Sequence, residues 1–144
     1  MARLRGGVGG TLVLDAEGLT KLAANHPAAF AQLKAARQRR SKVVTAASTL
    51  PEVLRGGSRD ARMHHVLGRL TVVSINQEKG RAAGELLGRT GLSGQRCALD
   101  ALLATVALAQ PRPVILLTSD AEDMRRLTEE PARRRAERVE VARI

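Results

Sequence analysis

The chain has 144 residues and a formal net charge of +10, from 24 Lys and Arg residues against 14 Asp and Glu residues. This length fits a single domain, and 44% hydrophobic with 26% charged residues argues against a wholly disordered chain. The surplus of positive charge makes nucleic acid a candidate partner. The sequence has no Trp or Tyr and one Phe, which excludes proteins that stack several bases on aromatic side chains.

The cysteine count and the hydropathy pattern further limit the class of protein and the compartment in which it works. The single cysteine, Cys97, excludes an intrachain disulfide and a Cys-rich zinc site, and it fits a reducing compartment. The sequence contains no apolar run of about 18 residues, the length that a membrane-spanning helix needs. The N-terminal residues also lack the apolar stretch of a signal peptide. We therefore expect a cytoplasmic protein without membrane contact.

The pattern of apolar residues predicts short strands that alternate with helices. Residues 1–10, rich in Gly and Arg, are expected to form a flexible lead-in to one domain over residues 11–144. The expected strands cover residues 11–14, 43–45, 70–75, 114–117 and 138–143. The expected helices cover residues 16–25, 27–36, 59–68, 78–87 and 95–109, with a helix that Thr49 caps and Gly56 closes, and one from Ser119 to Leu127.

This order of elements predicts an α/β fold with a mostly parallel sheet. The expected strands are continuous apolar runs, as is typical of strands covered by helices on both faces. Two segments match a capping box, in which a hydroxyl residue caps a helix and a Glu follows three residues later. They are Thr49 with Glu52, and Ser119 with Glu122.

Carboxylates follow two of the expected strands. The first strand ends at Asp15, and the strand over 114–117 is followed by Thr118, Ser119 and Asp120. Ligands of open parallel sheets bind at the carboxyl ends of strands, near the point where the strand order reverses, so both carboxylates could lie in one crevice. The alternative is that each Asp only caps a helix or forms a turn.

Asp100 is the carboxylate that is hardest to explain structurally. It lies in the segment of residues 97–109, in which all residues apart from Asp100 and Thr105 are apolar. A carboxylate on such a helix costs several kcal/mol unless it is paired or bound to a metal. The alternative is a pair with Arg96 one turn earlier, but such a surface pair contributes only tenths of a kcal/mol. We therefore favour a functional role for Asp100.

Two further carboxylates have roles that are ambiguous when each is taken alone, but together with Asp15, Asp100 and Asp120 they indicate a metal site. Glu52 has a complete structural role in the Thr49 capping box, and Asp123 could simply favour a helix N-terminus. Clustered carboxylates repel one another, and a hard divalent cation such as Mg²⁺ relieves that repulsion. An acidic metal site on a basic protein suggests a phosphodiester substrate, whose backbone the basic surface would hold.

Four segments of the sequence resemble, in order and spacing, the PIN-domain ribonucleases, and specifically the VapC-type toxins of bacterial toxin–antitoxin pairs. The matching segments are Leu12-Val13-Leu14-Asp15, Ser48-Thr49-Leu50-Pro51-Glu52-Val53, Leu99-Asp100-Ala101-Leu102-Leu103-Ala104 and Leu117-Thr118-Ser119-Asp120-Ala121-Glu122-Asp123. The resemblance covers residues 11–127 and extends to the last strand. It implies a three-layer α/β/α, PIN-like fold. One departure is the run Asp15-Ala16-Glu17-Gly18, where the family often has a small hydroxyl residue or Asn; Glu17 has no assigned role.

The resemblance also implies a chemistry for the site. The acidic quartet of the family falls on Asp15, Glu52, Asp100 and Asp120, and it implies Mg²⁺ or Mn²⁺ dependence and cleavage of single-stranded RNA. We expect Asp15 and Asp100 to bind the metal directly, and Glu52 and Asp120 to act through water. Asp123 is a further possible metal ligand. Thr118 or Ser119 is expected to contact a carboxylate or the substrate phosphate.

The resemblance implies two protein partners, a second copy of the chain in a homodimer and a cognate antitoxin. The antitoxin is expected to insert an Arg among the carboxylates and to cover apolar side chains on the helices after Asp15 and His26. These side chains are Leu19, Leu22, Phe30 and Leu33, about half of which could instead belong to the core. The alternatives are a catalytically silent PIN-like module that binds RNA or protein, a DNA-directed nuclease on the same fold, and a phosphatase on a related fold.

Overall fold

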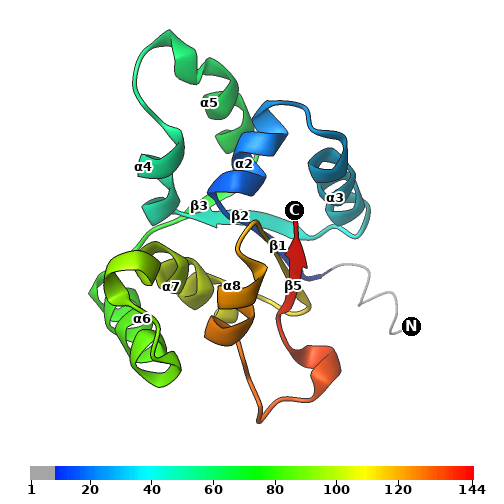
Figure 1. Ribbon diagram of the computed structural model, residues 1–144. Helices are drawn as coiled ribbons and strands as arrows, with labels where there is room; N and C mark the ends of the chain where they lie inside the picture. Colours follow the sequence, from blue (N-terminus) through cyan, green and yellow to red (C-terminus); the bar gives the residue numbers. More distant parts are fainter. Residues whose placement is uncertain (1–8) are drawn as a thin grey trace.

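The computed structural model describes residues 9–144, and the strands in that range form one parallel sheet (Figure 1). The strand order is β3-β2-β1-β4-β5, and all four pairings are parallel. The strands are β1 (Thr11–Leu14), β2 (Lys42–Ala46), β3 (Thr71–Val73), β4 (Val114–Thr118) and β5 (Glu140–Arg143). The predicted α/β class and parallel sheet are therefore confirmed.

Helices connect the strands in the predicted order. The α-helices are α2 (Ala16–Ala23), α3 (Pro27–Gln38), α4 (Leu50–Val53), α5 (Ala61–Leu67), α6 (Gln77–Thr90), α7 (Gly94–Leu108) and α8 (Ala121–Leu127). Three 3₁₀ turns complete the described chain: η1 (Ala47–Thr49), η2 (Ser58–Asp60) and η3 (Arg135–Glu137).

The sheet lies between two helical layers, so the predicted three-layer arrangement is confirmed. Side chains alternate along each strand: Leu12 and Leu14 pack with the layer of α2, α3 and α5, whereas Val13 packs with the layer of α6, α7 and α8. On β4, Leu116 and Leu117 divide in the same way between the two core clusters. Figure 1 shows α2, α3 and α5 on one side of the sheet and α6 and α7 on the other.

The start of β1 requires a glycine. Gly10 has a φ of +92°, and a Cβ there would lie 2.6 Å from the carbonyl oxygen of Pro113. The carbonyl of Gly10 accepts a hydrogen bond from the N–H of Lys42 (3.0 Å), which joins it to the start of β2. Of the expected lead-in, residues 1–8 lie outside the described residues, and Gly10 is already buried in the domain.

Both predicted capping boxes are wrong. Thr49 ends the η1 turn with helical backbone angles (φ −80°, ψ −23°), and its side chain makes no capping hydrogen bond. A capping residue normally has an extended backbone, which lets its side chain reach back to the free N–H groups of the first turn. The helix that follows is one turn long and ends at Val53, before Gly56. In the other segment Asp120, and not Ser119, directly precedes α8, again without a side-chain cap.

Candidate functional site

Asp15 lies at the end of the central strand and is held by backbone donors on both carboxylate oxygens. Its Oδ1 accepts from the N–H of Gly18 (2.8 Å), which caps α2, and its Oδ2 accepts from the N–H of Ser119 (3.0 Å). The residue is 9% exposed. Asp15 therefore does cap a helix, which the sequence offered as the alternative to a functional role. Its second carboxylate oxygen is hydrogen-bonded to the residue that follows β4.

The ends of β1 and β4 form the point at which the strand order reverses. Leu14 pairs with Leu117, so the residues that follow the two strands are adjacent. Thr118, the last residue of β4, is fully buried and accepts a hydrogen bond on Oγ1 from the N–H of Asp120 (3.0 Å). Thr118 thus orients the backbone of Asp120, whose side chain is exposed, as is that of Ser119. This edge of the sheet is where parallel α/β folds bind ligands.

Asp100 reaches the same place from α7. Burial is the largest cause that raises the pKa of Asp100, and the charge of Asp120, a hydrogen bond with its carboxyl group and the charges of Asp15 and Glu52 act in the same direction. Together they raise this pKa to about 7. Within residues 9–144, Asp100 forms no salt bridge, so the alternative pair with Arg96 is absent. The carboxylate is therefore half-buried among like charges, and no ion pair within the described residues compensates it.

Glu52 joins the group from α4. Partial burial raises the pKa of Glu52, and the charge of Asp15 raises it further. Because the Thr49 capping box does not form, the structure gives Glu52 no capping role. The four predicted carboxylates are therefore brought together: Asp100 is coupled electrostatically to the other three, and Glu52 is coupled to Asp15.

A second contact extends the group toward α8. Ligand atoms of Cys97, Asp100 and Asp123 lie within 4.8 Å of one another, and the thiol of Cys97 lies 3.9 Å from Oδ2 of Asp123. Burial raises the pKa of this thiol, and the Asp123 and Asp100 carboxylates raise it further, so it stays a neutral donor. Cys97 is buried, as expected, but its place beside the carboxylates was not predicted. Its spacing of three residues from Asp100 on one helix was the available signal.

Two further features of the site were also missed from the sequence. The backbone N–H of Ser119 holds Asp15, and a backbone donor leaves no mark in a sequence pattern. Arg143, on β5 opposite Thr118, donates to the carbonyl of Ser119 (3.2 Å) and places a cation at the edge of the group. Glu17, which had no predicted role, lies half-buried in the first turn of α2.

These side chains can bind a hard cation. The donors are carboxylate oxygens from four elements, and in the part of the chain that the structure describes none of them is neutralised by a salt bridge. A carboxyl group whose pKa lies near 7 because of burial and of neighbouring carboxylates releases its proton when a divalent cation replaces that proton. The donor set therefore fits Mg²⁺ or Mn²⁺, which prefer oxygen ligands.

No protein-family model and no curated protein matches the sequence. Solved structures share its fold: a chain of VapBC2 from Rickettsia felis, bound to a DNA fragment from its promoter, superposes with a TM-score of 0.67 at 16% identity, over 93% of this chain and 98% of that one. A chain of VapBC-1 from nontypeable Haemophilus influenzae superposes with a TM-score of 0.63 at 16% identity, over 92% and 97%. The chain therefore has the PIN-like fold of the VapC-type toxins that it resembles.

No helix within residues 9–144 combines the length and the apolar character that crossing a bilayer requires.

Proposed function

We propose that the protein is a metal-dependent endoribonuclease that hydrolyses phosphodiester bonds of single-stranded RNA, and that it acts as the toxin of a toxin–antitoxin pair. The observation that carries this proposal is the group of uncompensated, mutually coupled carboxylates at the reversal point of the sheet. The PIN-like fold shared with VapBC structures supports the same chemistry, and the net charge of +10 suits a polyanionic substrate.

In this proposal Asp15 and Asp100 hold Mg²⁺ or Mn²⁺ directly, and Glu52 and Asp120 act through water. The bound ion supplies Lewis-acid chemistry at the scissile phosphate. Asp15 is suited to a direct contact because two backbone N–H groups fix its position and leave other lone pairs free. Glu52 and Asp120 have exposed carboxylates, which can orient the attacking water and accept its proton.

Three further residues have supporting roles in the proposal. Asp123 is a candidate for a further ligand because it lies beside Asp100. Ser119 presents an exposed side chain at the site and is the candidate for contact with a substrate phosphate. Thr118 is buried, so it acts on the substrate only through the position of Asp120. No protein residue forms a covalent intermediate.

The toxin part of the proposal adds a homodimer and a cognate antitoxin in the cytoplasm. A group of carboxylates without a cation attracts a guanidinium, and a bidentate Arg–carboxylate pair is among the strongest polar contacts. We therefore expect the antitoxin to insert an Arg between Asp15 and Asp100. Of the four apolar side chains considered for its docking, Leu19 and Leu22 belong to the core, whereas Leu33 is half-buried and Phe30 is exposed.

The experiment that tests the nuclease activity is cleavage of a single-stranded RNA with and without Mg²⁺. Asp100→Asn keeps the size of the side chain and removes its charge, and we expect it to lower the rate more than about a hundredfold, since loss of a group that merely supports a ligand already costs about 10- to 100-fold. The matched control is Glu85→Gln, an exposed carboxylate on α6, which should cleave like the wild type.

Two results would contradict the nuclease proposal: full activity in EDTA, or full activity of the Asp100→Asn variant. A matched single-stranded DNA substrate separates the proposed RNA activity from a DNA-directed nuclease. Toxicity on expression, relieved by Asp15→Ala, tests the toxin role alone, because harmless expression of active protein leaves the nuclease activity intact.

A further inference from the structure

The last strand brings a cation to the edge of the sheet at which the four carboxylates meet. β5 runs parallel to β4, and Arg143, its last residue, pairs with Thr118, the last residue of β4. Asp120 follows β4, and Asp15 follows β1, the next strand in the sheet. Neighbouring strands lie about 4.8 Å apart, so β5 is roughly 10 Å from β1 at this edge. Arg143 is therefore a neighbour of the carboxylates without being one of their ion-pair partners.

The side chain of Arg143 points to the face of the sheet that α7 and Asp100 cover. Side chains alternate along a strand, and on β5 Ala142 and Ile144 pack with the layer of α2, α3 and α5. Val141 packs with the opposite layer, and Arg143 shares its direction. That layer contains α7 and also α8, which packs against β5 (Figure 1). A ligand that reaches both the carboxylates and Arg143 can therefore stay on one face of the sheet.

The guanidinium group of Arg143 has donors available for a ligand. Its Nη1 donates to the carbonyl of Ser119 (3.2 Å), and within residues 9–144 the group makes no other hydrogen bond and no ion pair. By contrast, Arg55, which follows α4, already donates to the carbonyls of Pro51 and Leu54 (2.7 and 2.8 Å). The contact with Ser119 holds the guanidinium of Arg143 in place, and the other N–H groups of its planar fork stay free.

We propose that Arg143 binds a phosphate group of the substrate, next to the phosphate at which the metal acts. The identity of that substrate rests on the proposed function. The flanking phosphates of a nucleic acid strand are anionic, and the carboxylates repel any of them that no cation holds. A fixed guanidinium can donate to two oxygens of one phosphate, which gives both attraction and direction. Arg143 would thereby set the register of the strand across the site without reading its sequence.

The test is the binding of fluorescein-labelled hexauridylate by the Asp100→Asn variant in Mg²⁺, measured by fluorescence anisotropy over a range of salt concentrations. Addition of Arg143→Gln should weaken binding about three- to tenfold, between the effect of an exposed ion pair and that of a charge-assisted hydrogen bond. It should also make the plot of log affinity against log salt less steep by about 0.7, the contribution of one phosphate contact on a single strand. Arg143→Lys should keep the steeper slope and bind more weakly than Arg, because Lys cannot form the bidentate contact.

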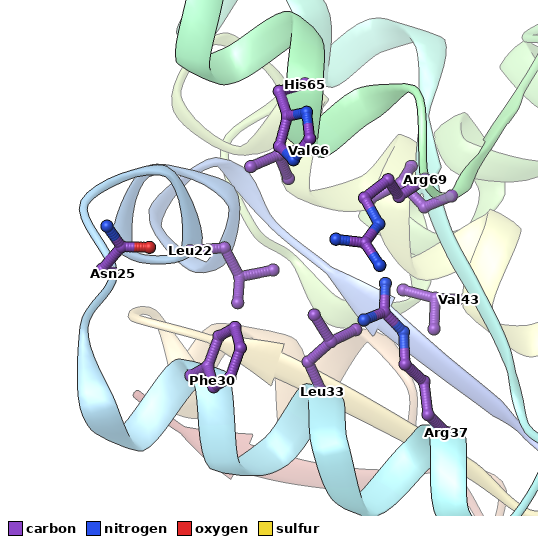
Figure 2. A pocket seen from close by; sticks show the side chains of 10 residues that line it. Leu22, Asn25, Phe30, Leu33, Arg37, Val43, His65, Val66 and Arg69 are labelled. Atoms are coloured by element: carbon purple, nitrogen blue, oxygen red, sulfur yellow. The ribbon is translucent and has the colours of Figure 1, made fainter.

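A matched control lies at the opposite edge of the sheet. Arg37 and Arg69 line a pocket of about 150 Å³ between α2, α3 and α5, with the exposed Phe30 on its rim (Figure 2). Val43, near the start of β2, and Leu70, just before β3, also line this pocket. The pocket therefore sits by the amino ends of these strands, whereas Arg143 lies at the carboxyl end of its own strand.

Arg37→Gln removes the same charge as Arg143→Gln. Arg37 is exposed, and within residues 9–144 its guanidinium makes no hydrogen bond and no ion pair. In the Asp100→Asn background it should change neither the slope nor, by more than about twofold, the affinity at roughly 0.1 M salt, where exposed charges separated by more than about 10 Å are largely screened.

Three results would overturn the inference. Equal effects of Arg143→Gln and Arg37→Gln would show that only net charge matters, and an unchanged slope in Arg143→Gln, or no binding of hexauridylate at all, would leave Arg143 without a phosphate. A purely structural role through Ser119, which holds Asp15, predicts that unchanged slope together with weaker Mg²⁺ binding. The test measures no cleavage. Binding through Arg143 without cleavage contradicts the nuclease proposal alone, and cleavage without a role of Arg143 in binding contradicts this inference alone.

Discussion

At the scale of single residues, Asp15 has a structural and a candidate functional role at once. It caps α2 through Gly18 and is also coupled to Glu52 and Asp100 in the acidic group. From the sequence these roles were alternatives, because an Asp after a strand is common in turns and helix caps. They coexist because a carboxylate has two oxygens and several lone pairs.

Asp100 makes the stability of the metal-free protein depend on pH. Its pKa is raised from the ordinary 3.8 to about 7, so between these values the folded state holds more protons than the unfolded state. We therefore expect the free energy of unfolding in EDTA to fall as the pH rises from about 4 to about 7, and then to level off. After a discount for solvent screening of this half-buried group, the fall should be about 1–2 kcal/mol.

The measurement is urea unfolding of the metal-free protein at several pH values, followed by circular dichroism. Asp100→Asn should remove most of the fall, and Glu85→Gln should retain it. Addition of Mg²⁺ at alkaline pH should raise the stability of the wild type and affect the Asn variant less. A wild-type profile that rises over the same range would show that the carboxylates are not coupled as described.

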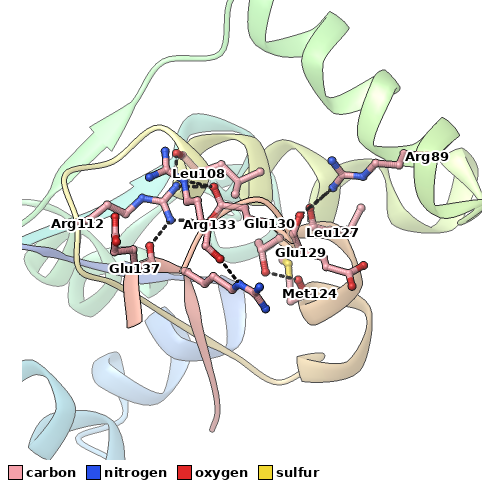
Figure 3. A network of polar contacts seen from close by, with 11 residues as sticks. Arg89, Leu108, Arg112, Met124, Leu127, Glu129, Glu130, Arg133 and Glu137 are labelled. Atoms are coloured by element: carbon pink, nitrogen blue, oxygen red, sulfur yellow. Dashed lines mark hydrogen bonds and ion pairs between the residues drawn. The ribbon is translucent and has the colours of Figure 1, made fainter. Parts of the chain in front are cut away.

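At the scale of elements, hydrogen bonds from the guanidinium group of Arg112 hold the segment between α8 and β5 in place (Figure 3). Arg112, before β4, binds both oxygens of Glu130 (2.7 and 3.0 Å) and donates to the carbonyls of Leu108 and Glu137. Burial raises the pKa of Glu130, but Arg112 and then Arg133 outweigh it and hold that pKa below its ordinary value. The contact therefore stabilises the fold above the ordinary pKa of Glu and is lost as the pH falls below it.

Arg112→Ala should lower the free energy of unfolding by about 1–3 kcal/mol, since it removes a partly buried bidentate partner. The matched control is Arg134→Ala: its partner is Glu137 in the same segment, but the Arg134 side chain is 88% exposed, so the loss should stay below about 0.5 kcal/mol. Urea unfolding at neutral pH and near pH 3 measures the free energy of unfolding of both variants. The difference between their losses should be smaller at pH 3. Equal losses for the two variants would contradict this account.

Strands were easier to predict than helix ends. The run Thr11–Leu14 is buried throughout and apolar after Thr11, and it was predicted with its bounds, because burial on both faces leaves a clear pattern. The helix ends depended on side-chain geometry: Thr49 has the right residue type for a cap, but the η1 turn gives it a helical backbone. The predicted strand over 70–75 shortens to Thr71–Val73, since β3 pairs only with β2 at the edge of the sheet.

At the scale of the whole molecule, topology explains how distant carboxylates meet. Asp15 and Asp120 are far apart in sequence, but β1 and β4 are neighbours in the sheet, so their ends are adjacent. The strand alternation predicted a parallel sheet, and with it a shared crevice. Because strand order and side-chain direction are properties of the folded chain, the sequence could not place Cys97 beside Asp123 or Arg143 beside Ser119.

The net charge of +10 gives the proposed RNA binding a measurable salt dependence. We expect the affinity of Asp100→Asn for a single-stranded oligoribonucleotide in Mg²⁺ to fall more than about tenfold between roughly 50 and 200 mM salt, the loss expected when about three or more phosphates are neutralised. Fluorescence anisotropy of a labelled oligonucleotide measures it. An affinity that does not change with salt would argue against a polyanionic substrate.

The exposed position of Phe30 has an optical consequence. A chain without Trp or Tyr has no indole or phenol emission and hardly absorbs in the near ultraviolet, so its folded core contributes almost no background. Phe30→Trp would place a single fluorophore on the rim of the pocket between α2 and α3, at a side chain that is half open to solvent. Its emission would shift to shorter wavelengths when a ligand covers it, and every change in the spectrum would report on this one location.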